Sequence, residues 1–293
     1  MSEKQILKNR HEFLFGHDVK WANPNGDPLD ENRPRLDDET SILLVRDARI
    51  KRTIRDTIEE FYKGNGREIF IRKDYKPDGK PKTKTDIVAE AKQEIDKDKD
   101  SGSFLSKLLD KFIDIRLFGA TFALPKDKDS KGSGKGKQQN KDQESSQEEK
   151  QEESDLNNNE SLVGPVQFQF GRSIHRVTIE KIQGTSIMPS EGGKAQGTFT
   201  EGYVVPYAFI LFYGIANEKA AEDTHLTDED LSLMFEAMWL GYKAGTDVLS
   251  GSKLGHAPRI LIDIVYKPGI MAHIGDLDSC IRHNPRPGLE DEA

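Results

Sequence analysis

Residues 13–55 constrain the fold more than any other stretch, because they encode a strand, a chain reversal and a helix in succession. Residues 13–21 predict the strand, and WANPNGDP at 21–28 ends it. Asn-Gly tolerates positive φ, and the two prolines fix φ on either side, so the chain must turn there. An acidic loop and a helix over about residues 45–63 follow.

This helix has an apolar stripe. At about 100° per residue, Ile50, Ile54, Ile58 and Phe61 fall within roughly 80° of one another. We therefore expect the stripe to pack on a sheet. The remaining circumference carries cations, namely Arg46, Arg49, Lys51, Arg52 and Arg55. A ridge of cations beside a strand end suits phosphate binding, whereas an ordinary solvated helix face explains the same pattern equally well.

The remaining apolar patterns predict further strands and helices. We expect strands at 68–72, 163–182, 204–215 and 259–266, and helices at 87–95, 104–119 and after an acidic N-cap at 227–230. Without insertions the order is β, α, β, then β, α, β. This order predicts an α+β fold of ferredoxin-like or RRM-like type, an antiparallel sheet with two helices on one face.

Two segments interrupt this plan within one domain spanning 1–293. Residues 74–162 read as an inserted region, and residues 126–160 within it hold one large apolar side chain, Leu156. Such a composition cannot offset the entropy of ordering, so we expect 126–160 to be disordered. Residues 181–203 are rich in Gly, Ser and Thr and predict a protruding hairpin.

The net charge does not exclude a nucleic-acid partner, and the single cysteine favours a reducing compartment. The net charge of −8 is concentrated: residues 126–160 hold seven lysines and ten acids, and Glu290, Asp291 and Glu292 add three more. A local basic ridge can therefore still bind nucleic acid. With one cysteine, Cys280, and no apolar leader or membrane-length run, we expect a cytoplasmic protein without membrane contact.

Signatures of catalysis and metal binding are missing. KGSGKGK at 131–137 fails the Walker pattern because Gln138 stands where Ser or Thr is needed. There is no G-x-S-x-G elbow and no H-E-x-x-H spacing. We expect no catalytic residue, no metal and no cofactor.

Several motifs in order resemble the repeated backbone subunit of type I CRISPR Cascade complexes, most like the I-B branch, in the RAMP superfamily. They span about 13–266 and comprise WANPNGDP (21–28), RDARIKRTIR (46–55), DIRLFG (114–119), GPVQ (164–167), and GG (192–193) running into VPY (205–207). The resemblance implies a hand-like subunit with an RRM-like palm, a finger insertion and a thumb hairpin.

The resemblance also implies partners: crRNA, other copies of the chain, a large subunit, a crRNA 5′-end-capping subunit and a crRNA-processing endonuclease. Copies would stack along the crRNA as a helical filament and present the guide to target DNA. Lys51, Arg52 and Arg55 would contact guide phosphates, together with Arg46 and Arg49.

Other positions are weaker RNA-binding candidates. The thumb would carry Lys194 and two wedges beside a displaced base, Met188 and Phe199, although a small hairpin core explains the wedges equally well. Lys20, Trp21, Asn23 and Asn25 lie where the first strand meets the turn, and Trp21 also fits a core position. Arg116 and His175 complete the set of RNA-binding candidates. The alternative role of Arg116 is a buried ion pair, and that of His175 is a position on a strand surface.

Two other functions stay open. Related backbone subunits of type III effectors cut target RNA with a loop carboxylate, and the acidic loop offers Asp27, Asp30, Asp37 and Asp38. A free-standing RNA-binding regulator that never assembles is the third possibility.

Overall fold

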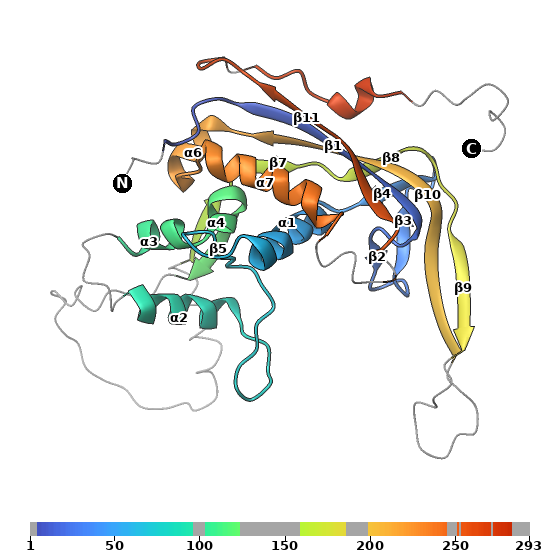
Figure 1. Cartoon of the computed structure of the whole chain (residues 1–293), viewed down its shortest axis with the longest axis horizontal. Coiled ribbons are helices and arrows are strands. Elements are labelled where there is room, and N and C mark those ends of the chain that lie inside the picture. The colour runs from blue at the N-terminus through green and yellow to red at the C-terminus, as the bar shows by residue number, and fades with distance from the viewer. Residues whose placement is uncertain are drawn as a thin grey trace, which may run out of the picture.

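A computed structural model describes residues 5–95, 103–123, 159–185, 199–244, 251, 253–270 and 272–282. Its centre is an antiparallel sheet in the order β11-β1-β10-β8-β4-β3-β2 (Figure 1). The strands are β1 (His11–Ala22), β2 (Gly26–Asp27), β3 (Arg33–Leu36), β4 (Ile42–Val45), β7 (Val166–Phe168), β8 (Gly171–Arg176), β9 (Glu180–Thr185), β10 (Phe199–Ala216) and β11 (His256–Val265), with β7 and β9 both paired to β10.

The four strands β11-β1-β10-β8 and two helices reproduce the ferredoxin-like plan. In chain order they run β1, α1 (Asp47–Phe61), β8, β10, α7 (Asp228–Gly241) and β11. The predicted fold class is therefore confirmed. The strand predicted at 68–72 is wrong, because that segment makes only an isolated bridge between Glu68 and Phe112. The second strand of the plan is β8, about a hundred residues further on.

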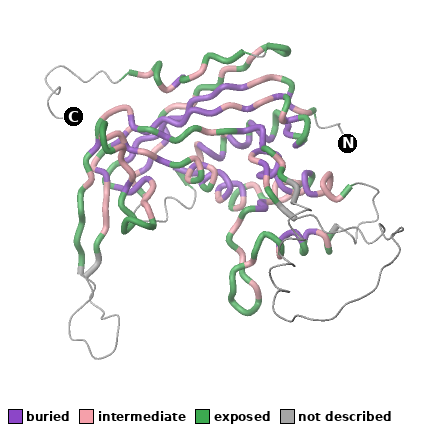
Figure 2. Tube along the Cα trace, turned by 180° about the vertical axis from the view of Figure 1, so that it is seen from behind, coloured by how far each residue is buried: buried purple, intermediate pink, exposed green. Residues whose placement is uncertain are grey.

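The helices cover one face of the sheet, and the main core lies between them (Figures 1 and 2). Alternate residues of β1 point into it, with Phe13, Phe15 and Val19 fully buried. From α1 the stripe of Ile50, Ile54 and Ile58 is also buried. This stripe confirms the predicted orientation of the helix. Phe61, the last residue of α1, is 45% exposed and lies outside the core.

The inserted region carries a second, smaller core. It contains α2 (Lys84–Ile95), α3 (Phe104–Lys111), α4 (Ile113–Phe118) and a two-stranded sheet of β5 (Gly119–Ala123) and β6 (Asn159–Val163). Its buried cluster is formed by Phe70, Ile87, Val88, Ala91, Leu108, Leu109, Phe112 and Ile115. The helix predicted over 104–119 is thus two helices, because Phe112 has extended backbone angles at their junction.

Part of the segment expected to be disordered lies in a strand. β6 begins at Asn159, so the last two residues of 126–160 pair with β5 in an antiparallel ladder. The rest of that segment falls outside the described residues.

The hairpin expected at 181–203 is formed by β9 and the first part of β10. Register pairs run from Val204 with Glu180 to Phe199 with Thr185. Beyond Val204 the same strand continues into the sheet, where Val205 pairs with Ala22 and Ala216 with His11. The hairpin therefore projects from the sheet as an extension of a central strand (Figure 1). After β10, α6 (Glu218–Thr224) leads to α7, whose N-terminus has the expected capping box of Thr227 and Asp230.

The face of the sheet opposite the helices is partly covered by residues 272–282, which we call the strap. The strap includes a short 3-10 helix, η3 (Leu277–Cys280), drawn above the sheet in Figure 1. Leu277 packs there with Leu14, Leu211 and Tyr213. An ion pair between Arg172 and Asp278, 2.7 Å between nitrogen and oxygen, adds a further contact.

Glu12 fastens the strap to the sheet. This fully buried carboxylate accepts hydrogen bonds from the hydroxyls of Tyr213 (2.7 Å) and Tyr266 (2.5 Å). The backbone N–H groups of Ile274 (2.9 Å) and Gly275 (2.6 Å) also donate to it. Burial alone would raise the pKa of Glu12, but the four donors lower it below 4.5.

Glu12→Gln is expected to loosen the strap, because an amide NH₂ group replaces an oxygen that accepts from buried donors. We expect a loss of about 1–3 kcal/mol of unfolding free energy and faster amide exchange in 272–282. The wild-type contribution of Glu12 is present above the unfolded pKa of 4.5 and is lost as pH falls through the lower folded pKa. Glu60→Gln, on an exposed part of α1, is the control. Unchanged exchange in the Glu12 variant would contradict this assignment.

Candidate nucleic-acid interface

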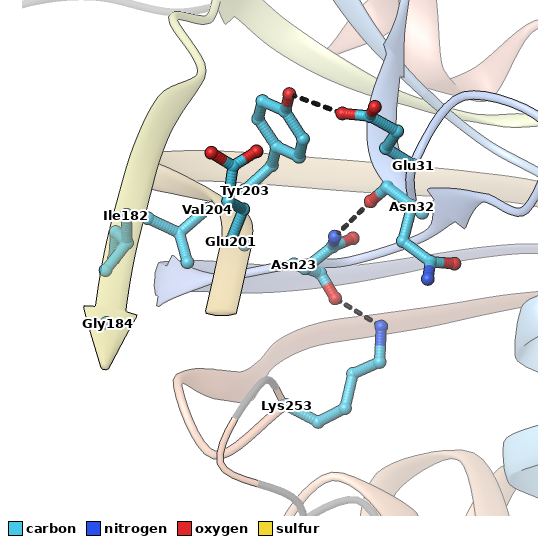
Figure 3. A pocket seen from close by; sticks show the side chains of 11 residues that line it. Asn23, Glu31, Asn32, Ile182, Gly184, Glu201, Tyr203, Val204 and Lys253 are labelled. Atoms are coloured by element: carbon cyan, nitrogen blue, oxygen red, sulfur yellow. Dashed lines mark hydrogen bonds between the residues drawn. The ribbon is translucent and has the colours of Figure 1, made fainter. Parts of the chain in front are cut away.

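A pocket of about 630 Å³ lies where the turn after β1 meets the base of the hairpin (Figure 3). Its walls come from the turn, the hairpin and a loop before β11. They are formed by Asn23, Gly26, Glu31, Asn32, Ile182, Gly184, Glu201, Gly202, Tyr203, Val204 and Lys253. The sequence pattern did not single out Tyr203, Glu31 or Lys253 as site residues, although Glu31 follows the turn motif by three residues and Tyr203 ends the predicted hairpin.

Asn23 holds the turn in shape. Its side-chain amide donates to the backbone carbonyl of Asn32 at 2.7 Å, and its own backbone carbonyl accepts from the ammonium of Lys253 (Figure 3). At Gly26, an added Cβ would lie 2.4 Å from that same Asn32 carbonyl oxygen, so the turn requires glycine. Asn23 was predicted to contact RNA, but the structure buries it and uses it to close the turn.

The hairpin wall of the pocket has mixed charge. The Tyr203 hydroxyl donates to Glu31 at 3.1 Å, and this bond raises the pKa of Tyr203 (Figure 3). The Arg33 guanidinium lies over the Tyr203 ring, 6.0 Å from its centroid. Lys181 pairs with Glu201 at 2.7 Å, and its hydrogen bond lowers the pKa of that carboxyl. An aromatic ring, two cations and two carboxylates therefore lie together beside the pocket.

Some cations of α1 are exposed to solvent, and others are held by neighbouring side chains. Arg46, the N-cap residue, is exposed. Arg52 is 46% exposed and pairs with Asp56 at 2.6 Å. Lys51 is 15% exposed, pairs with Asp47 at 2.9 Å and lies over the Phe118 ring. Because pairs on the surface of a helix are weak, Arg52 can exchange its partner for a phosphate at little cost. Arg49 is half-buried and donates to Thr53 at 2.9 Å.

Arg55 lies inside the protein. Its guanidinium pairs with Asp114 at 2.9 Å, and the two side chains are 11% and 1% exposed. Asp114 also accepts from the backbone N–H groups of Phe70 (2.7 Å) and Ile71 (3.0 Å). Arg55 was predicted to contact guide phosphates, but its burial makes it a support for the inserted region.

Arg116 is likewise a buried ion-pair partner. Two of its nitrogens lie 2.8 Å from the two carboxylate oxygens of Asp230, and its side chain is 5% exposed. Its guanidinium also donates to the backbone carbonyls of Leu109 and Gly66. The structure therefore supports the alternative role in place of an RNA contact.

The strand end exposes two of the predicted residues. Trp21 is 64% exposed with φ of 47°, so the core role considered for it is wrong. Lys20 is 58% exposed. Asn25 lies within the turn, where its reoriented amide oxygen accepts from Arg35 at 2.9 Å and from the Arg46 N–H at 3.2 Å. His175 stacks on Tyr207, with centroids 5.6 Å apart, on the face of the sheet away from the helices.

The remaining candidates lie at the hairpin tip. Met188 and Lys194 fall outside the described residues. The backbone of Phe199 pairs with Thr185 at the start of β10, and its side chain is not described.

Among the described residues, no three or more His, Cys, Asp or Glu side chains gather as they would around a metal ion. Within the same part of the chain, no helix is both long and apolar enough to cross a membrane.

Together the fold and the interface define an RRM-like α+β protein with an inserted helical region and a projecting hairpin. The family model for CRISPR-associated protein Cas7 matches residues 9–290. The chain belongs to the CRISPR-associated protein Cas7 family. A curated relative from Haloferax volcanii, named CRISPR-associated protein Cas7, is 30% identical over 280 residues, which cover 93% of this chain and 75% of the relative.

Two solved structures of CRISPR complexes show a partial likeness to this chain. One titled "CRISPR RNA-guided surveillance complex, pre-nicking" matches with a TM-score of 0.48 and 11% identity, over 86% of this chain and 77% of that chain. One titled "Cryo-EM structure of the Type III-B Cmr-beta bound to cognate target RNA" matches with a TM-score of 0.43 and 10% identity, over 87% and 61%. The family assignment rests on the sequence match and not on these two likenesses.

Proposed function

We propose that this chain is a non-catalytic backbone subunit of a type I, I-B-like CRISPR surveillance complex. Copies of it assemble along a crRNA, grip the guide phosphates and present the guide bases for pairing with target DNA. Other subunits, including a large subunit, a 5′-end-capping subunit and a processing endonuclease, complete the assembly. Membership of the Cas7 family supports this proposal.

The observation that carries the proposal is the exposed cationic end of α1 beside the base of the hairpin. Arg46, whose backbone N–H donates to Asn25 in the turn, and Arg52 are exposed on α1, and Tyr203 and Lys253 wall the pocket that borders the same turn. Arginine forks suit phosphate oxygens, and an aromatic ring suits a base of any identity. The site can therefore hold a nucleic-acid backbone without reading its sequence.

The type III ribonuclease is the weaker alternative. Of the loop carboxylates it would need, Asp27 pairs with Arg35 at 3.0 Å and accepts from the Leu29 N–H at 3.0 Å. Asp37 accepts from Thr40, which lowers its pKa. These local roles support turn formation in preference to acid–base catalysis.

Electron microscopy of the protein co-expressed with a repeat-spacer RNA tests the proposal, together with nuclease protection of that RNA. Regularly stacked subunits and an even protection ladder are expected. Single particles on RNA without periodicity would instead indicate a free-standing RNA-binding regulator. Evenly spaced cuts in added complementary RNA would indicate the ribonuclease.

The double variant Arg46→Ala/Arg52→Ala is expected to weaken guide binding on every sequence without lowering the melting temperature. Each lost contact to a single-stranded phosphate should reduce the slope of log K against log salt by about 0.7, so the pair should reduce it by about 1.4. Binding titrations at four salt concentrations measure this slope. The matched control is Lys63→Ala/Lys219→Ala, which removes two cations that are 58% and 68% exposed elsewhere. An unchanged slope in the first variant would refute the phosphate contacts.

A further inference from the structure

The described residues of the strap pack on one part of the sheet face that points away from the helices. Its apolar contacts reach Leu14, Leu211 and Phe209. Two residues before Phe209 along β10, Tyr207 is 45% exposed. Among the described residues, the strap therefore packs on the part of this face farther from the hairpin, and Tyr207 stands nearer the hairpin on the third strand of the ferredoxin-like plan.

Four further side chains surround Tyr207, and we call the five together the open-face patch. Lys20 is its register partner on β1, and His175 of β8 stacks on its ring with an interplanar angle of 2°. Asp18 of β1 and Arg259 of β11 both act on the Tyr207 hydroxyl electrostatically. Lys20 and Arg259 are 58% and 50% exposed and share the single carboxylate of Asp18, so a positive charge remains at the rim of the patch.

Asp18 gives the patch an acceptor that lacks a donor. Its Oδ2 atom lies 2.8 Å from the Nε and Nη2 atoms of Arg259. Its Oδ1 atom is buried and accepts no hydrogen bond from any described residue. A buried acceptor without a donor is costly, and the half-exposed Arg259 side chain is the group that would move to admit one. The N–H groups on base edges are donors of the required kind.

We propose that the open-face patch binds single-stranded nucleic acid, with one base stacked on Tyr207 and the adjoining phosphates on Lys20 and Arg259. An aromatic ring on a central strand of an RRM-like sheet is a general platform for base stacking. Cations at its rim suit a polyanion. The patch would be a second nucleic-acid surface, on the opposite face of the sheet from α1, and it does not require the chain to polymerise on a guide.

Binding of the full-length protein to fluorescent oligomers of about 12 nucleotides tests the patch. The probes are oligouridylate, oligodeoxythymidylate and an abasic deoxyribose-phosphate oligomer. Tyr207→Leu should lower the affinity for a base-bearing oligomer roughly tenfold, the scale of one lost stacking contact, and leave the abasic affinity unchanged. Tyr207→Phe should bind like wild type. Whether the loss falls on RNA, on DNA or on both tells which kind of strand the patch accepts.

Phe61→Leu is the matched control, because Phe61 is also 45% exposed but lies at the end of α1 on the other side of the sheet. Thermal melting establishes that each variant folds. The patch proposal falls if Tyr207→Leu changes no affinity, or lowers the base-bearing and abasic affinities equally. It also falls if Tyr207→Leu only prevents copies from associating. If Tyr207→Leu is silent while Arg46→Ala/Arg52→Ala weakens guide binding, the proposed function survives without the patch.

Discussion

Arg55→Ala is expected to destabilise the protein by about 3–5 kcal/mol, because it leaves the buried Asp114 carboxylate without its cation. Asp114 is 1% exposed and links α4 to the segment at Phe70 and Ile71 through backbone hydrogen bonds. The sequence alone indicates the opposite outcome, in which Lys51→Ala, Arg52→Ala and Arg55→Ala together weaken RNA binding and leave the fold intact.

Urea unfolding separates these outcomes. Arg52→Ala is the matched control, since it removes an arginine three residues away whose pair with Asp56 lies on the surface. The control should change stability by less than about 0.5 kcal/mol. Replacing both partners, as in Arg55→Met/Asp114→Asn, should recover part of the loss because no buried charge then remains. Wild-type stability of Arg55→Ala with selective loss of RNA binding would return Arg55 to the interface.

Acid is expected to destabilise the protein through His17, a core residue on β1. His17 stacks on the Tyr242 ring, with centroids 4.5 Å apart, and His256 lies 5.4 Å away. Burial, and then the positive charge of Arg49, lower the pKa of His17 from 6.5 to about 3. Burial also lowers the pKa of His256. Both imidazoles are therefore neutral in the folded protein.

A histidine with a lowered folded pKa binds its proton more readily when the chain is unfolded. Its contribution is therefore intact above pH 6.5 and declines as the pH falls toward 3, costing about 2 kcal/mol between pH 7 and pH 5. Unfolding free energies at these two pH values should differ less in His17→Phe than in wild type. His273→Gln, at an exposed position, should retain the wild-type dependence. Equal pH dependence in all three proteins would contradict the role of His17.

Local sequence patterns correctly predicted features that depend on residues a few positions apart, such as the buried face of a helix or its N-cap. The 3.6-residue stripe of Ile50, Ile54 and Ile58 fixed the buried face of α1, and Thr227 and Asp230 marked the start of α7. The strand predicted at 68–72 is not formed, because burial alone does not distinguish a strand from other buried segments. Ile69 and Phe70 are buried as expected of a strand, but Ile69 packs in the main core and Phe70 in the core of the inserted region, and neither pairs in the sheet.

The candidate interface was harder to predict, because the order of charged residues along a helix does not show which side chains of other elements lie opposite them. Arg46, Arg52 and Arg55 look alike in sequence, yet only Arg55 meets a buried carboxylate, contributed by a residue 59 positions away. Tyr203 lies 172 residues from its partner Glu31, and Lys253 lies 230 residues from Asn23, so the local sequence pattern did not connect either residue with the turn. Asn23 lines the pocket, but its side-chain NH₂ group donates to the turn itself, which the sequence pattern did not reveal.

β10 runs as one continuous strand from the sheet into the hairpin. This one strand covers 18 residues, about 60 Å at roughly 3.4 Å per residue. Toward the hairpin, β10 pairs with β1 as far as Val205, and the next residue, Val204, pairs with β9. Pairing with β8 is limited to Ile210 and Leu211. The distance from the sheet to the described part of the hairpin is therefore set by the length of this strand. In any regular array of these chains, the spacing between neighbouring copies would then depend on the length of this strand within a single copy.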